Sequence, residues 1–331
     1  MLKLVKSNSK KISDVLYLPL FEDDFNSLKD LERNLGISII AKLKTYGFNG
    51  SFMEKNSFEI IFGKKGFSLN FIGLGKSKEL DEEKVFKVFS SITYTRLKSK
   101  KKIKESSIIY PKSFDKNLFK LSIEGLYNGF YSFDKYKAKK DNISSYKVGI
   151  IASSIGEKLF KLVVSNANST FLGVNLTREL INEQPQFLVP STLASHARRI
   201  SKGKNIRCTV YGKKQILEKK MLGIWDVGKG SVNEPKFIHL VYKSKNLNKK
   251  SKKIALIGKG VTYDTGGLSL KPADFMLTMK MDMGGAGCVL GVFQALEKLQ
   301  PKNIEVHGLI PAVENMPGPN ALRPGDVIKS L

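Results

Sequence analysis

The feature that most constrains the fold is an alternation of short strand-like runs with longer helix-like runs. Residues 57–62, 206–211 and 304–309 have the length and apolar content of strands. Residues 82–97 and 284–299 instead repeat apolar side chains every three or four positions, as amphipathic helices do. The buried face of the later helix would carry Val289, Phe293 and Leu296. Strands that alternate with such helices predict helices packed on a sheet, which is an α/β fold.

The length of the chain favours two domains. Its 331 residues exceed the roughly 250–300 residues that a single core usually fills. Residues 155–183 are typical of one long helix, with apolar side chains such as Leu162 along one side. We therefore predict a small N-terminal α/β domain at 1–150, a linker helix at 151–175 and an α/β domain with a mostly parallel sheet at 176–331.

Composition narrows the cellular setting. The two cysteines, Cys208 and Cys288, lie too far apart in sequence to suggest a disulfide framework or a cysteine-type zinc site. The N-terminus lacks the unbroken apolar stretch of a signal peptide, and no apolar run approaches the roughly 20 residues of a membrane span. We therefore expect a cytoplasmic protein without a membrane segment.

The formal net charge of +26 raises the possibility of a nucleic-acid-binding protein. The excess is nearly all lysine and is spread along the chain, and its densest run lies at 98–104. Basic surface loops explain this pattern more simply than a binding face does. Weak, salt-sensitive and non-specific binding to nucleic acid is what such a distribution predicts.

The chemistry is concentrated in residues 258–285, a glycine-rich run that follows the apolar run 254–257, which we expect to be a buried strand. The run contains Lys259, Asp264, Lys271 and Asp282. Hard divalent cations prefer carboxylate oxygens, and one carboxylate can bridge two ions. A lysine held near buried backbone is poorly solvated and can act as a neutral nitrogen ligand, whereas a charged lysine can stabilise an oxyanion. These residues together predict a metal site with a polarised carbonyl.

Each of these residues also has a structural interpretation. Asp264 precedes Gly-Gly and could cap a turn, and Asp282 precedes a helix and could be its N-cap. Lys259 and Lys271 could be surface lysines of a lysine-rich chain. The histidines show no metal-type spacing, so each is expected to be structural; they are His196, His239 and His307.

The run resembles the active-site segment of the leucine aminopeptidases, the cytosolic two-metal M17 family. The stretches that carry the resemblance are 258–267 (GKGVTYDTGG), 269–272 (SLKP) and 279–286 (MKMDMGGA). Residues 175–182 and 185–193 are similar to the family's entry into its catalytic domain, and 311–326 (PAVENMPGPNALRPGD) to a later strand and loop. The similarity extends over nearly the whole chain, more loosely before about residue 120.

The resemblance implies a role for each site residue. Lys259 would bind one metal through a neutral amine, Asp264 would bridge two ions, and Asp282 would complete the protein's share of the Lys259 site. Lys271 would be the catalytic lysine that polarises the scissile carbonyl, and Met279 would line the pocket for the first side chain of the substrate. The implied enzyme removes an unblocked, leucine-like N-terminal residue from peptides, uses two zinc, manganese or magnesium ions, and assembles as a hexamer.

The sequence departs from the family pattern at its end. The family has a second motif, Asn-Thr-Asp-Ala-Glu-Gly-Arg, shortly after the segment that matches 323–326, and the chain stops at Leu331 before it. That motif supplies further metal ligands. We therefore expect an N-terminal fragment with an incomplete catalytic domain, an unpaired sheet edge, poor solubility and little activity alone. The alternatives are a non-catalytic subunit of the same family and a basic binding protein.

Overall fold

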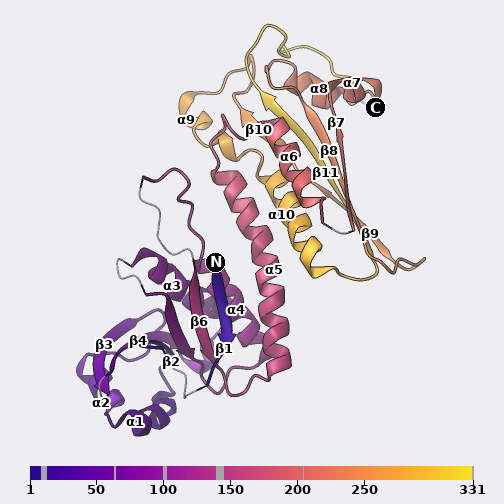
Figure 1. Ribbon diagram of the computed structural model, residues 1–331. Coiled ribbons are helices and arrows are strands. Elements are labelled where there is room, and N and C mark those ends of the chain that lie inside the picture. Colours follow the sequence, from indigo (N-terminus) through magenta and orange to yellow (C-terminus); the bar gives the residue numbers. More distant parts are fainter. Residues whose placement is uncertain (9–12, 63–64, 100–102, 139–144, 204, 330–331) are drawn as a thin grey trace. The chain divides into compact units, whose positions relative to one another are not determined.

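The structure is a computed structural model that describes residues 1–8, 13–62, 65–99, 103–138, 145–203 and 205–329 (Figure 1). It divides into two compact units, Met1–Asn168 and Ser169–Leu331, and the boundary between them along the chain falls within the long helix α5 (Glu157–Asn182). The domain limits given above stay a prediction. Part of the basic run 98–104, residues 100–102, lies outside the described residues. No helix in the described part of the chain has both the length and the apolar character that crossing a membrane requires.

The first unit contains a six-stranded sheet in the order β1-β6-β5-β2-β4-β3 (Figure 1). Its strands are β1 (Leu2–Lys6), β2 (Val15–Phe21), β3 (Lys55–Phe62), β4 (Lys65–Gly75), β5 (Glu105–Ile109) and β6 (Tyr146–Ile151). Every pair is parallel except β3 with β4. The α/β class predicted from the sequence is therefore confirmed, and the sheet of this N-terminal unit is mostly parallel.

Helices cover both faces of this sheet. They are α1 (Lys29–Leu35), α2 (Ile39–Thr45), α3 (Glu82–Lys98) and α4 (Lys116–Gly129), with the short 3-10 turns η1 (Phe25–Leu28) and η2 (Ser77–Glu79). Alternate residues of β2, Leu16, Leu18 and Leu20, pack with the side chains of α1 and α2. The other face carries an aromatic cluster in which Phe89 of α3 stacks on Tyr110 with ring centroids 5.0 Å apart. Because both of its faces are covered, β2 is buried along its whole length.

β1 and β2 precede residue 57, the start of the first strand expected from the sequence, and were not predicted. β2 contains Pro19, a residue that usually marks an edge strand because it lacks a backbone N–H. The structure accommodates it in the sheet because β5 pairs with β2 only at Leu16 and Tyr17, two residues before the proline.

The buried side of α5 only partly matches the predicted one. Phe160, Val163, Ala167 and Phe171 are 8% exposed or less and follow each other at spacings of three and four. Leu162, which was assigned to the same side, is 58% exposed, so that assignment is wrong. A helical turn of 3.6 residues places residue 162 about 100° from residue 163, outside the narrow buried stripe.

The second unit contains a five-stranded mixed sheet. The strands of this sheet are β7 (Ile206–Tyr211), β8 (Lys236–Lys243), β9 (Lys252–Ile257), β10 (Gly260–Asp264) and β11 (Ile304–Asn315). The helical segments of the unit are α6 (Pro190–Ile200), α7 (Lys213–Glu218), α8 (Leu222–Gly228), α9 (Ala273–Met276), η3 (Met279–Met281) and α10 (Gly284–Leu299). Both β9 and β10 run parallel to β11, whereas β8 is antiparallel to both β11 and β7. The sheet of this unit is thus half parallel rather than mostly parallel, because β7, β8 and β11 follow one another as antiparallel neighbours.

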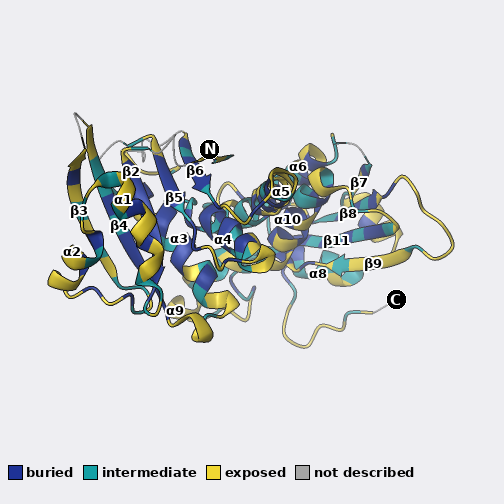
Figure 2. Ribbon diagram, turned by 90° about the horizontal axis from the view of Figure 1, so that it is seen from below, coloured by how far each residue is buried: buried dark blue, intermediate teal, exposed yellow. Residues whose placement is uncertain are grey.

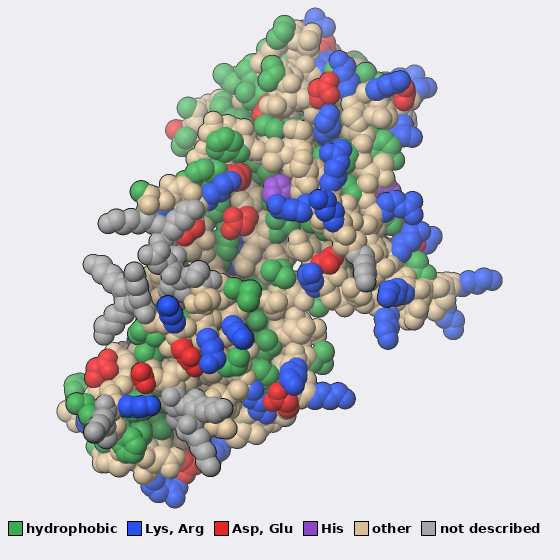
Figure 3. All heavy atoms as spheres, viewed as in Figure 1, with side chains coloured by type: hydrophobic (Ala, Val, Ile, Leu, Met, Phe, Trp, Pro, Cys, Tyr) green, Lys and Arg blue, Asp and Glu red, His purple; other side chains and the backbone are tan. Residues whose placement is uncertain are grey.

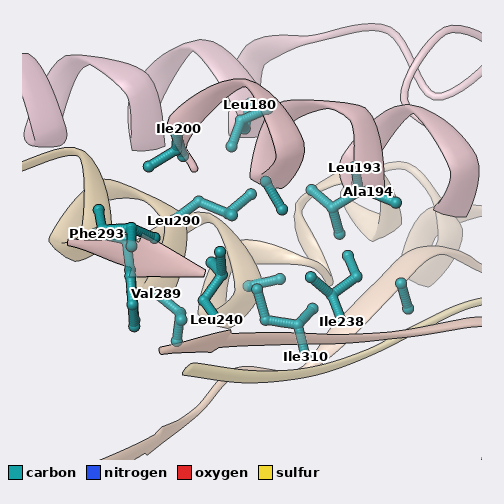
Figure 4. Packing of buried hydrophobic residues seen from close by; sticks show 14 of the residues in the cluster. Leu180, Leu193, Ala194, Ile200, Ile238, Leu240, Val289, Leu290, Phe293 and Ile310 are labelled. Carbon is teal, nitrogen blue, oxygen red and sulfur yellow. The ribbon is translucent and has the colours of Figure 1, made fainter. Parts of the chain in front are cut away.

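The core of the second unit lies between this sheet and helices α5, α6 and α10 (Figure 4). Its members include Leu180, Leu193, Ile200, Ile238, Leu240, Leu290, Phe293 and Ile310. The predicted inward face of α10 is confirmed, since Val289, Phe293 and Leu296 are 5%, 0% and 9% exposed. This packing fixes the start of α10 against the strands that carry the site.

β9 is the exposed edge of the second sheet, in contrast to the buried strand predicted there. In the described part of the chain it pairs with β11 alone, and Figure 2 shows it as exposed ribbon. Ile254 is 39% exposed and Ile257 is 75% exposed. An apolar sequence indicates that a strand prefers burial, but the neighbours that would bury it are decided by the tertiary structure.

Candidate active site

The site begins at a break between two strands on the same side of β11. β9 pairs with the first half of β11, up to Leu309, and β10 pairs with its last residues, from Ala312. The break consists of Gly258 and Lys259. The N-terminus of α10 packs directly on it: the N–H of Ala286 donates to the carbonyl of Lys259 at 2.9 Å. A Cβ on Gly258 would lie 2.6 Å from the carbonyl oxygen of Gly285, so only glycine allows this approach.

Lys259 and Asp282 form the first ion pair of the site. Lys259 Nζ lies 2.8 Å from Asp282 Oδ1. The lysine side chain is 60% exposed, so the prediction that buried backbone would desolvate it is wrong: the flanking glycines are buried, but the side chain extends away from them toward Asp282. Asp282 is 17% exposed, and its Oδ2 is buried without a hydrogen-bond partner among the described residues. Nor is it the N-cap of α10, a position that Met283 takes.

Asp264 and Lys271 form the second ion pair. Lys271 Nζ donates to Asp264 Oδ2 at 2.6 Å and contacts Met279 Sδ at 3.1 Å. The two side chains are 28% and 17% exposed, so neither is a freely solvated surface group. Met279 belongs to η3, the short turn just before Asp282. The contact to its sulfur therefore joins the Asp264 pair to the segment that carries Asp282.

The other oxygen of Asp264 is held by two more donors. Oδ1 accepts from the N–H of Gly266 at 3.0 Å, which is the turn-capping role that the sequence had suggested as an alternative, and from Nδ2 of Asn315 at 2.7 Å. Burial alone would raise the pKa of Asp264, but the hydrogen bonds from Lys271, Gly266 and Asn315 outweigh it and hold the pKa below its ordinary value. The carboxylate is therefore ionised, as a metal ligand must be.

The donors present fit a hard divalent cation. Each of the two carboxylates pairs with one lysine, and a buried carboxylate oxygen such as Asp282 Oδ2 needs a partner that the described residues do not supply. The side-chain nitrogens of Lys259 and Lys271 lie within ion-pair distance of these carboxylates, where a bound cation would also lie. In the described part of the chain, no three His, Cys, Asp or Glu side chains converge on one point. The present groups are thus a partial ligand set.

Two relationships in this unit had no signal in the sequence. Asn315 lies 51 residues from Asp264, and only the pairing of β10 with β11 brings them together. His239 and His307 lie on β8 and β11 with Nε2 and Nδ1 3.0 Å apart and stacked rings, and His307 Nε2 lies 3.0 Å from Glu305 Oε1. This histidine pair is remote in sequence from the glycine-rich run and plays no part in its ion pairs.

Comparison with known proteins defines the class. The family described as "Cytosol aminopeptidase family, catalytic domain" matches residues 175–331, the segment that contains both ion pairs. The chain is 40% identical over 270 residues to a probable cytosol aminopeptidase of Aquifex aeolicus, covering 80% of this chain and 53% of that protein. It is 34% identical over 333 residues to one of Clostridium perfringens, covering 99% of this chain and 66% of that protein. The chain belongs to the cytosol aminopeptidase family.

A solved structure shows the same fold. The chain superposes on the bottromycin maturation enzyme BotP, in complex with Mn, with a TM-score of 0.78 and 24% identity, covering 96% of this chain and 63% of that one. The chain thus spans between about half and two thirds of the length of these relatives. The likeness to BotP establishes the α/β architecture of this chain.

Proposed function

We propose that this chain contributes to a two-metal aminopeptidase that removes unblocked, leucine-like N-terminal residues from peptides. The observation that carries the proposal is the pair of lysine–carboxylate contacts, one of 2.8 Å from Lys259 at the break between β9 and β10 and one of 2.6 Å to Asp264 at the end of β10. They gather the four residues that the family resemblance marks as metal-binding or catalytic. Family membership supports the reaction class, and the manganese named with BotP supports a divalent metal.

In this proposal each residue has a separate task. Asp264, held through Oδ1, presents Oδ2 to a cation, while Lys259 and Asp282 hold a second position. Bound Mn²⁺, Zn²⁺ or Mg²⁺ ions would supply an activated water and polarise the carbonyl of the substrate. Lys271 would turn from Asp264 toward the carbonyl oxygen and stabilise its negative charge. Met279, already in contact with Lys271, would border the pocket for the first side chain.

The ligand count sets the expected activity. Manganese and magnesium usually take six ligands, and catalytic zinc takes three protein ligands and a water. The described residues offer two carboxylates and the amine of Lys259, so two ions held by them alone would be under-coordinated. We therefore expect metal binding but little turnover from these 331 residues by themselves. We further propose a cytoplasmic location and, as the family resemblance implies, a homo-hexamer.

The charge pattern does not favour nucleic acid as an alternative ligand. On the face drawn in Figure 3, Lys and Arg side chains are spread over both units and alternate with acidic and apolar side chains. Such a distribution supports at most weak and salt-dependent association.

The test combines metal binding with hydrolysis. Isothermal titration of the 331-residue chain with MnCl₂ should show saturable binding that is lost in Asp264→Asn and Asp282→Asn. Hydrolysis of a leucyl anilide in Mn²⁺ should stay far below the roughly 10 s⁻¹ of a typical enzyme. Absence of Mn²⁺ binding would overturn the proposed metal site, and turnover near that rate would overturn the proposed ligand shortage.

A further inference from the structure

Asn315 makes three hydrogen bonds to the loop that carries Asp264. It is the last residue of β11, and its Nδ2 donates to Asp264 Oδ1 at 2.7 Å. Its backbone carbonyl accepts from the N–H of Thr265 at 3.0 Å and from the Thr265 hydroxyl at 2.8 Å. The backbone contacts fix the path of the loop, and the side-chain contact fixes the carboxylate itself.

Counting acceptor positions shows what this contact does. Each carboxylate oxygen offers about two lone-pair positions. On Asp264 Oδ1 both are used, one by Asn315 Nδ2 and the other by the Gly266 N–H at 3.0 Å. On Oδ2 one is used, by Lys271 Nζ at 2.6 Å. Oδ2 is therefore the oxygen with a position left for a cation.

The loop is shaped to admit the Asn315 side chain. Gly266 and Gly267 have φ values of +88° and +68°, a region that favours glycine. A Cβ on Gly267 would lie 2.9 Å from Asn315 Oδ1. A side chain at position 267 would push the Asn315 amide away from Asp264, so the contact between Asn315 and Asp264 depends on glycine at this position.

We infer that Asn315 is a positioning residue of the proposed metal site, which turns the Asp264 carboxylate so that Oδ2 faces Lys271 and the bound cation. The inference rests on the proposed function. The terminal torsion of an aspartate is broad, so without a donor on Oδ1 the carboxylate can rotate and offer either oxygen. Partners that orient a metal ligand typically contribute 10–100-fold to metal affinity.

The test compares two asparagine-to-leucine changes, one at the end of β11 and one in the connection between α8 and β8 that bonds to that strand end. Asn315→Leu removes the amide but keeps the backbone bonds to Thr265. Asn233→Leu is the matched control, because Asn233 Nδ2 donates at 2.9 Å to Glu314, the residue next to Asn315, and among the described residues Asn233 has no hydrogen bond to the four site residues. Titration with Mn²⁺ should show an affinity at least about tenfold weaker for Asn315→Leu and within about twofold of the parent for Asn233→Leu.

A second measurement works without metal. Hydrogen exchange of the Gly266 amide, which depends on the orientation of Asp264, should be about tenfold faster in Asn315→Leu, while the Thr265 amide should be unchanged. Equal Mn²⁺ affinity of the parent chain and Asn315→Leu would overturn the positioning role and leave the proposed function intact. If the parent chain bound no Mn²⁺, the proposed function would fail, and unchanged Gly266 exchange would then overturn the positioning role as well.

Discussion

Glu314 and Asn315 are consecutive residues of β11 whose side chains form hydrogen bonds to two different segments, the connection between α8 and β8 and the end of β10. Glu314 accepts hydrogen bonds from the Ser231 hydroxyl and, at 2.9 Å, from Asn233 Nδ2, whereas Asn315 donates to Asp264 at 2.7 Å. Successive side chains of a strand point to opposite faces, so one strand end can serve both sides of the sheet. The end of β11 thereby ties the connection between α8 and β8 to the loop that carries the site.

Replacing Glu314 should destabilise the second unit. Glu314 is 9% exposed, and Glu314→Ala leaves the Ser231 and Asn233 donors without their acceptor. We expect a loss of about 1–3 kcal/mol in the free energy of unfolding, measured by urea denaturation. Glu234→Ala is the control, since Glu234 is 57% exposed and pairs only with Lys236 at 3.2 Å among the described residues. Equal midpoints for the two variants would contradict the anchoring role.

The crossing of α5 and α10 should not tolerate a methyl group. A Cβ on Gly291 would lie 2.3 Å from Thr177 Oγ1 and 2.6 Å from the carbonyl oxygen of Gly173. Gly291→Ala should therefore cost about 1–3 kcal/mol of unfolding free energy by overpacking. Gly223→Ala in α8 meets open space and should be neutral or slightly stabilising, because alanine favours helix. Thermal unfolding of both variants checks the prediction, and a stable Gly291→Ala protein would refute it.

The histidine pair should make stability depend on pH. Burial, the neighbouring His307 and Arg207 lower the pKa of His239, so the folded protein favours its neutral form. The unfolded chain then binds more protons just below the ordinary histidine pKa of about 6.5, and stability should fall as the pH drops through that value. The other charged groups at the pair are Glu305, beside His307, and Lys243, which pairs with Glu305 at 3.2 Å.

The measurement is the urea midpoint between pH 5 and 8. His239→Gln should show a shallower pH dependence than the parent chain, whereas His196→Gln, which removes a histidine outside the pair, should keep it. If the urea midpoint changed with pH equally in the parent chain and in His239→Gln, the histidine pair would not be the cause of the pH dependence between pH 5 and 8.

The exposed edge strand should promote self-association. Ile257 is 75% exposed on β9, and an apolar edge with free backbone groups is a template for pairing with another chain. Ile257→Lys should lower light scattering at equal concentration with little change in stability. Val232→Lys is the control, because Val232 is 97% exposed but lies in a loop. The edge would be excluded as the cause if Val232→Lys reduced scattering as much as Ile257→Lys.

The sequence by itself determined the elements that carry strong local signals. The periodicity of α10 placed Val289, Phe293 and Leu296 inward, and they are buried. The spacing in the glycine-rich run marked Lys259, Asp264, Lys271 and Asp282, and the structure brings them together in two ion pairs. The prediction for α10 succeeds because helical periodicity acts over a few residues, whereas the roles of the four site residues stay a prediction.

Only the tertiary structure decided which surfaces are covered and which distant groups meet. Ile257 reads as a buried residue but is exposed, since burial depends on the strand's neighbours rather than on its own composition. Asn315 reaches Asp264, and His239 reaches His307, only through strand pairing across 51 and 68 residues. Sheet register sets such contacts, and no local pattern in one sequence encodes it, because register is fixed by the packing of the whole unit.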